Sequence, residues 1–341
     1  MGGFPVKIQL FAAAAAAALT VSMTTSAAFA FCESGEIVVK FAHVVAAKGS
    51  PKGETATALA ERVNSEMNGK LCMEVYPNSQ LYNDDKVLEA MLLGDAQLAA
   101  PSLSKFEKYT KKFSIFDLPF LFEDIDAVDR FQSGEAGQDL LRSMEGNGLL
   151  GLGYWHNGMK QISAKKPLLT PEDAKGLKFR IQRSDVLEAQ FQALDANPQK
   201  LAFSEVYGAL QTGVVDGQEN TWSNIYTKKF HEVQDGITES NHGIIDYLLV
   251  TSVEFWESLP DDVREQFSTI IQEETAKGNA LANKLGVESR QKILDSGGEI
   301  RELTAEQRAS WSKAMEPVWA QFEGDIGADL IEAAKAANTG S

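Results

Sequence analysis

The sequence predicts an α/β protein built as two lobes, because strand and helix patterns alternate along most of its 341 residues. The alternation begins at residue 36 and starts again after residue 148, and no low-complexity linker separates the two series. A long helical pattern follows residue 260. The composition, 44% hydrophobic and 23% charged, is that of a globular protein with a substantial core. Several crossings of the chain between the lobes explain the missing linker.

The first series consists of strand and helix units. Helical spacing of apolar residues predicts one helix that begins at Pro51 and another that Asp84 and Asp85 cap. The strands expected around them are 36–43, 71–77 and 96–100. Repeated units of this kind predict a mostly parallel sheet.

The second series contains two further helices, at 185–194 and from Ser204 to Gly213. The strands expected there are 148–155, 160–166, 177–182 and 197–203. An apolar strand at 244–252 is expected to return the chain to the first lobe. We therefore assign residues 31–156 and 246–285 to lobe I, and residues 157–245 and 286–341 to lobe II.

No proline interrupts the helical pattern between Pro260 and Leu294. A helix of about 35 residues would be about 50 Å long, which is longer than one domain is wide. It would therefore brace both lobes. Gly278 and Gly286 leave two shorter helices as the alternative.

Residues 1–30 have the pattern of a secretory signal peptide. Lys7 is their only charge, an apolar run extends from Leu10 to about Val21, and the segment ends in Ala28-Phe29-Ala30. The run is shorter than the roughly 20 residues of a membrane-spanning helix. We therefore expect export and a mature chain that starts near Phe31, without a membrane anchor.

Export permits a disulfide between the two cysteines, Cys32 and Cys72. They lie at the starts of two predicted strands, and they can meet if these strands are parallel neighbours. Two free thiols are the alternative. The sequence has no CxxC motif, which leaves a redox enzyme or zinc ribbon without support.

The charge and the missing motifs exclude several functions. With 32 basic and 48 acidic residues the net charge is −16, which disfavours binding to nucleic acid or to anionic membranes. No GxSxG, HExxH, P-loop or GxGxxG motif is present, and the four histidines show no metal-ligand spacing. We expect neither catalysis nor a cofactor nor a metal.

Two segments instead indicate a binding site. Arg180 interrupts the apolar strand LKFRIQ, and its guanidinium is suited to hold a carboxylate. An internal ion pair explains it equally well at this point. The segment QENTWSN offers the amide of Asn220 and the flat ring of Trp222 to a ligand. An ordinary loop with a half-buried tryptophan explains the same residues.

Long ordered motifs resemble the solute-binding proteins of TRAP transporters, in their C4-dicarboxylate-binding, DctP-like branch. These are FAHVVAAKGSPKG at 41–53, YPNSQLYNDDKVLEAMLLGDAQLAAPS at 76–102, and the stretch from Leu169 to Gln234 that contains GLKFR and GQENTWSN. The resemblance implies a two-lobed periplasmic binding protein fold, type II-like, with a lobe-spanning helix. It also implies a monomer that captures a small organic acid in the periplasm and docks on membrane subunits driven by an ion gradient.

The resemblance assigns binding roles to four residues: Arg180 holds a carboxylate, Lys160 is a second cation, Asn220 faces the ligand and Phe203 lines the pocket. Sialic-acid binders of the family carry arginine where Lys160 stands, so a smaller ligand is indicated. We expect succinate, malate or fumarate. Another organic acid (a sugar, keto or aromatic acid), a sensory binding protein and a periplasmic hydrolase or lyase are the alternatives.

The second carboxylate of such a ligand needs donors on lobe I, about 5–6 Å from the first. Lys52 is the leading candidate, because it lies at the start of a helix whose dipole favours an anion. His43 and Ser102, at strand ends, are further candidates, and Arg183 competes with them from lobe II. Each of these four would otherwise be a solvated surface residue.

Overall fold

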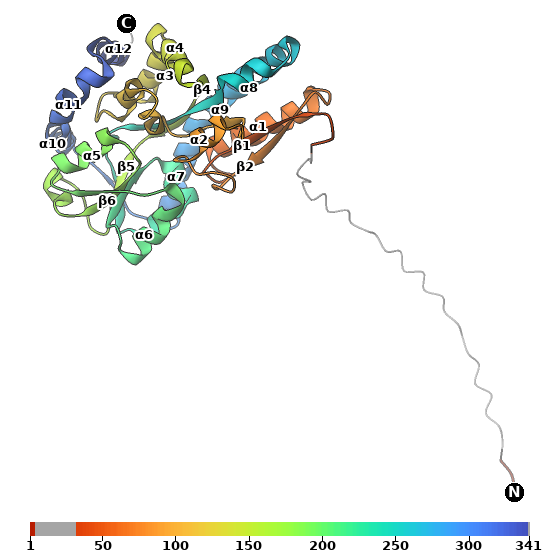
Figure 1. Cartoon of the computed structure of the whole chain (residues 1–341). Coiled ribbons are helices and arrows are strands. Elements are labelled where there is room, and N and C mark those ends of the chain that lie inside the picture. Colours follow the sequence, from red (N-terminus) through yellow and green to blue (C-terminus); the bar gives the residue numbers. More distant parts are fainter. Residues whose placement is uncertain (4–31, 340–341) are drawn as a thin grey trace. The chain divides into compact units, whose positions relative to one another are not determined.

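The computed structural model describes residues 1–3 and 32–339 (Figure 1). The predicted signal peptide, residues 1–30, lies outside the described residues apart from its first three. Residues 31–341 form one compact unit, and the fold below is that of its described part. The predicted α/β class is confirmed, with one sheet in each of two lobes.

The sheet of lobe I has five strands in the order β2-β1-β3-β10-β4. The strands are β1 Ile37–Ala42, β2 Leu71–Tyr76, β3 Leu98–Ala99, β4 Leu149–Met159 and β10 Ile244–Ser252. The helices around it are α1 Pro51–Glu66, α2 Val87–Leu92, α3 Ile125–Ser133, α4 Glu135–Arg142 and α8 Val253–Ser258, with 3-10 turns η1 Leu103–Phe106, η2 Lys111–Asp117 and η3 Glu145–Asn147.

The sheet of lobe II has six strands in the order β11-β9-β5-β8-β6-β7. The strands are β5 Gln161–Ala164, β6 Lys178–Ile181, β7 Asn197–Lys200, β8 Gly217–Asn220, β9 Gly236–Glu239 and β11 Ile300–Glu302. The helices with it are α5 Asp185–Ala193, α6 Val206–Thr212, α7 Trp222–Thr227 and α10 Ala305–Met315, with 3-10 turns η4 Pro171–Ala174, η5 Phe203–Glu205 and η6 Phe230–Val233.

Both sheets are mostly parallel, as expected, and each contains one strand that runs against all the others. In lobe I, β10 runs antiparallel to β3 and β4, and in lobe II, β5 runs antiparallel to β8 and β9. The remaining pairings are parallel. The antiparallel strands are those that carry the chain between the lobes, so their direction is set by the crossing and not by a βαβ unit.

The long helical pattern forms one continuous helix, α9, from Asp261 to Asp295, and not two shorter ones. Its first half buries Val263, Phe267 and Ile270 in the core of lobe I. Near its end Ile293 joins a core cluster of lobe II. The helix therefore braces both lobes, as predicted (Figure 1).

The last two helices differ from the lobe assignment made for residues 286–341. Helices α11 (Pro317–Ile326) and α12 (Ala328–Asn338) bury apolar residues such as Val318 and Ile331 in the main cluster of lobe I. Helix α10, in contrast, packs Trp311 against lobe II. The chain thus crosses from lobe II to lobe I once more after α10, because the apolar faces of α11 and α12 pack against η2 and α3.

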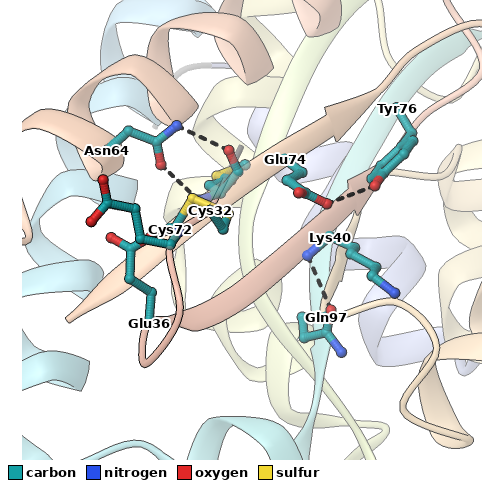
Figure 2. Close-up of a disulfide and its surroundings, with 10 residues drawn as sticks. Cys32, Glu36, Lys40, Asn64, Cys72, Glu74, Tyr76 and Gln97 are labelled. Atoms are coloured by element: carbon teal, nitrogen blue, oxygen red, sulfur yellow. Dashed lines mark hydrogen bonds between the residues drawn. A yellow bond between two sulfur atoms is a disulfide. The ribbon is translucent and has the colours of Figure 1, made fainter. Parts of the chain in front are cut away.

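A disulfide joins Cys32 to Cys72 at the start of β2. Strands β1 and β2 are parallel neighbours, and Val38 is paired with Cys72 in their register, so the geometric condition for this bridge is met. Figure 2 shows the bridge beside Asn64 of α1, whose side chain exchanges two hydrogen bonds with the backbone of Met73, at 2.7 and 3.0 Å. The bridge lies at the end of the sheet where β1 and β2 begin.

Candidate functional site

A pocket lies between the lobes at the carboxyl ends of strands from both sheets. Open α/β sheets bind ligands at this end of their strands. Lobe II contributes Arg180, Gln182, Ala202, Phe203, Asn220 and Asn224. Lobe I contributes Val44, Val45, Asn83, Asp84, Asp85, Ser102, Lys105, Ile245 and Tyr247.

Strand β6 places Arg180 in this pocket. Phe179 and Ile181 point into the core of lobe II, and the alternation of a strand then directs Arg180 and Gln182 to the opposite face. Arg180 is 2% exposed, and its Nε and Nη2 donate to the carbonyl of Leu201 at 3.1 and 2.9 Å. Burial lowers its pKa to about 10, so it stays charged at neutral pH.

No carboxylate within the described residues forms an ion pair with Arg180, although the sequence left an internal ion pair open. A buried guanidinium without a carboxylate is costly unless a ligand supplies one. The ring of Phe203 lies 5.9 Å from the guanidinium carbon and forms one wall beside it. The arrangement leaves a buried cation in the pocket lining with no carboxylate partner among the described residues.

Asn220 and Asn224 extend the polar wall of lobe II. Asn224 Nδ2 donates to Asn220 Oδ1 at 2.8 Å and to the Tyr247 hydroxyl at 3.2 Å, which fixes the orientation of both amides. The amide nitrogen of Asn220 is then left to donate into the pocket. Gln182 adds a buried Nε2 that has no hydrogen-bond partner in the described structure.

Lobe I supplies a cation that the sequence did not single out. Lys105, on η1, is buried and forms an ion pair of 2.8 Å with Asp85. Ser102 lines the pocket beside it. Burial alone would raise the pKa of Asp85. The charges of Lys105, Arg183 and Arg180 outweigh burial and lower this pKa, so Asp85 remains ionised.

Four predicted site residues line the pocket: Arg180, Asn220, Phe203 and Ser102. The other four are absent from its lining. Two of these lie beneath the wall of lobe I. Lys52 Nζ donates to the carbonyl of Ala100 at 2.7 Å and lies 3.6 Å from the centre of the Tyr247 ring, so it supports this ring from behind. Burial lowers its pKa to about 8.

His43 is 1% exposed, and neither ring nitrogen has a hydrogen-bond partner in the described structure. Burial, together with the charges of Lys52 and Lys228, lowers its pKa to about 3 and keeps it neutral. The competing candidate Arg183 has a side chain that is 73% exposed, 3.5 Å from Asp85.

Lys160 does not reach the pocket, because a buried carboxylate holds it. Its Nζ lies 2.8 Å from Glu219, and His242 contacts the same carboxylate at 2.8 Å. Burial would raise the pKa of Glu219, but the charge of Lys160 and the hydrogen bond with His242 lower it to about 2. Since Glu219 precedes Asn220 on β8, this cluster supports the pocket floor from the opposite face of the strand.

Trp222 also faces away from the pocket. It lines a separate hollow on the other face of the crossing strands, where Arg290 of α9 lies 5.7 Å from its ring. In β10 the pocket residues Ile245 and Tyr247 flank Asp246, which points to this second face and bonds His156 at 2.7 Å. Strand alternation thus separates the two hollows.

The pocket residues that the sequence interpretation missed include Gln182, Lys105 and Tyr247. Gln182 follows Arg180 at the two-residue spacing of a strand, and this signal could have found it. Lys105 and Tyr247 become visible only when the fold brings their segments to one edge. Among residues 32–339, the one group with metal-ligand spacing includes Cys32 and Cys72, which are joined in the disulfide.

Comparison with known proteins identifies the class of molecule that this fold and pocket define. Residues 41–325 match the family described as bacterial extracellular solute-binding protein, family 7. The chain belongs to this family. No helix in the described residues is both long and apolar enough to span a membrane.

One curated relative is the C4-dicarboxylate-binding periplasmic protein DctP of Vibrio cholerae, which is 62% identical over 94% of this chain and 97% of its own length. A solved TRAP periplasmic solute-binding protein from Shewanella oneidensis, with bound succinate, is 54% identical, with a TM-score of 0.88 over 89% of this chain and 99% of that one. A second, from Pseudomonas aeruginosa with bound L-malate, is 45% identical, with a TM-score of 0.81 over 84% and 99%.

Proposed function

We propose that this protein is the extracytoplasmic receptor of a TRAP transporter and captures a C4 dicarboxylate in the pocket between its lobes. The observation that carries the proposal is Arg180, a buried guanidinium that lines the pocket without a carboxylate partner in the described structure. The two solved relatives described above bind succinate and L-malate. The periplasmic relative from Vibrio supports the same location for this chain.

Arg180 and the amide of Asn220 hold one carboxylate from lobe II. Lys105 and Ser102 hold the other from lobe I, in place of Lys52. Because the two groups of donors belong to different lobes, a ligand with two carboxylates bridges the pocket and favours the closed arrangement. Each charge-assisted hydrogen bond of this kind is stronger than a neutral one.

The loaded, closed protein then docks as a monomer on the membrane subunits of the transporter. The protein carries out no chemical conversion of its ligand in this account. Its task is to bind the ligand reversibly. Hydrogen-bond donors in the pocket lining are sufficient for this task, and neither a nucleophile nor a general base is required.

A thermal-shift screen of purified mature protein tests the proposal. The panel contains succinate, L-malate, fumarate, a keto acid, a hexuronate and sialic acid. A ligand at 100 times its dissociation constant adds about 2.7 kcal/mol to the free energy of unfolding, which raises the melting temperature measurably. Any ligand that copurifies is first removed by unfolding and refolding.

We expect a shift with the C4 dicarboxylates and none with sialic acid. A shift with only a hexuronate or keto acid would retain the receptor role and replace the ligand. No shift with any acid, after removal of bound ligand, would contradict the receptor assignment.

A further inference from the structure

Asp84 lines the ligand pocket but takes no part in its ion pairs. Its neighbour Asp85 is paired with Lys105 at 2.8 Å, whereas the Asp84 carboxylate has no hydrogen bond or ion pair with any described residue. Asp84 lies in the turn before α2, at the edge of lobe I that faces Arg180. The half-buried Asp84 carboxylate therefore offers the pocket a hydrogen-bond acceptor that no described protein group occupies.

The charge of Asp84 opposes the binding of an anion. The charged residues of the lining are two cations, Arg180 and Lys105, and two acids, Asp84 and Asp85, so the walls carry no net charge. Burial lowers the pKa of Lys52 and of Arg180, and the nearby Asp84 charge partly offsets this for both. Asp84 thus acts on several cations of the site at once. A pocket that only had to hold two carboxylates would gain affinity without it.

A second unsatisfied acceptor comes from the other lobe. Asn224 lines the pocket, and its Oδ1 is buried without a hydrogen-bond partner in the described structure. Its amide nitrogen is committed to Asn220 and Tyr247, which prevents the group from turning a donor toward the ligand. Succinate and fumarate offer only acceptors once both carboxylates are ionised. A ligand with a hydroxyl group can donate to one of these acceptors.

We propose that Asp84 determines specificity: it accepts a hydrogen bond from the 2-hydroxyl of a C4 dicarboxylate, and its charge excludes ligands with a third carboxylate. The preferred ligand is then a 2-hydroxy dicarboxylate of the malate type. This inference rests on the proposed function, because it assumes that the two carboxylates occupy the cations. Selectivity by an unpaired charge, which costs affinity for the wrong ligand, is a general device of specific sites.

Calorimetric titration of three proteins with L-malate, succinate and tricarballylate tests the inference at neutral pH. The proteins are the wild type, Asp84→Asn and the control Asp95→Asn, which removes the same charge from an exposed position outside the pocket. A hydrogen bond to a charged acceptor changes affinity about tenfold to a hundredfold. We expect the wild type to bind L-malate tighter than succinate by about this factor, and not to bind tricarballylate.

In Asp84→Asn we expect tighter binding of succinate, a malate-to-succinate ratio within about threefold of one, and measurable binding of tricarballylate. Asp95→Asn should match the wild type. An unchanged ratio in Asp84→Asn, or a loss of affinity for succinate as well as malate, would overturn the inference.

The wild-type titration is itself decisive if the variant does not fold. Equal affinity for malate and succinate overturns the role of Asp84 and leaves the receptor assignment in place. If neither dicarboxylate binds the wild type, both the proposed function and this inference are wrong.

Discussion

At the scale of single residues, three buried cations lie in or near the pocket, and each has a different kind of partner. Arg180 is open to a ligand, while Lys160 is neutralised by Glu219 and Lys52 lies beneath Tyr247. Burial of a charge without compensation is expensive, so each buried cation requires a carboxylate, a carbonyl, an aromatic face or a ligand. We propose that the carboxylate for Arg180 comes from the ligand.

Lys160 illustrates why the sequence could not settle these roles. Motif position suggested a ligand contact, but the partner of Lys160 is Glu219, far away in the sequence on an antiparallel neighbouring strand. Which of 48 acidic residues meets which cation is a property of the sheet register. Arg180 stood out because it interrupts an apolar strand, but the strand pattern left an internal ion pair open, and only the family resemblance favoured a ligand.

His156 gives a pH-dependent prediction. Burial would lower its pKa, but Asp246 and Asp129 outweigh burial and raise it to about 9 from 6.5. A raised pKa in the folded state stabilises the fold below about pH 6.5, and this contribution is lost as the pH rises toward 9. The wild type should lose about 3 kcal/mol of unfolding free energy over this interval relative to His156→Gln.

Urea denaturation of both proteins across this pH interval measures the difference. Other titrating groups are shared and cancel in the comparison. Parallel stability curves for wild type and variant would show that His156 is not held in its charged form.

At the scale of helices and strands, the sequence predicted the regular units well where apolar periodicity was strong. Helix α1 begins at Pro51, with the Ser50 side chain accepting from the backbone of Gly53, as the local signals indicate. Strand β8 is absent from the predicted strands, and its sequence GQEN is polar. It forms a strand since its side chains are buried among partners from β5 and β6.

Two glycines of α9 provide a matched pair of substitutions. A Cβ on Gly278 would lie 2.2 Å from Thr55 Oγ1, because α1 and α9 pack closely there, whereas a Cβ on Gly286 would meet nothing within 4 Å. Gly278→Ala should therefore destabilise the protein by about 1–3 kcal/mol. Gly286→Ala should stabilise it by up to about 1 kcal/mol through helix propensity.

Thermal and urea unfolding of the two variants check this prediction. Equal effects of the two substitutions would mean that the contact between α1 and α9 is loose, contrary to the described packing.

The disulfide gives a prediction about an element far from the pocket. Cys32 and Cys72 are 40 positions apart and tie the start of the described fold to β2. Replacing both by serine should lower the free energy of unfolding by about 2–4 kcal/mol. Ligand affinity should stay unchanged, because the bridge lies at the opposite end of the strands from the pocket.

Urea unfolding and calorimetric titration of the double variant measure the two quantities. A marked fall in affinity with intact folding would show that the bridge shapes the pocket after all.

At the scale of the whole molecule, the two lobes meet around the pocket through specific polar contacts. Lys228 of lobe II donates to Asn78 of lobe I at 2.8 Å, and the backbone of Asp185 donates to Glu107 at 3.1 Å. These two contacts are exposed, so they can break and re-form at low cost. A ligand that joins Arg180 to donors of lobe I adds the stronger connection.

The two-lobed plan and the bracing helix were predictable from the sequence, because they depend on local periodicity and on the missing linker. The one reversed strand in each sheet and the last crossing of the chain were not predictable. The direction of β10 and the return of α11 and α12 to lobe I depend on which apolar faces complement each other in space. Local patterns in a single sequence do not show which distant apolar faces will pack together.

Calorimetric titration of Arg180→Ala with succinate and L-malate tests the central claim most directly. Loss of the cationic partner of a bound carboxylate should weaken affinity by about 2–5 kcal/mol, or 30-fold to several thousandfold, while the ligand-free fold is retained. Arg183→Ala is the matched control, since its exposed side chain is absent from the pocket lining, and it should bind almost like the wild type. A folded Arg180→Ala variant with wild-type affinity would contradict the account.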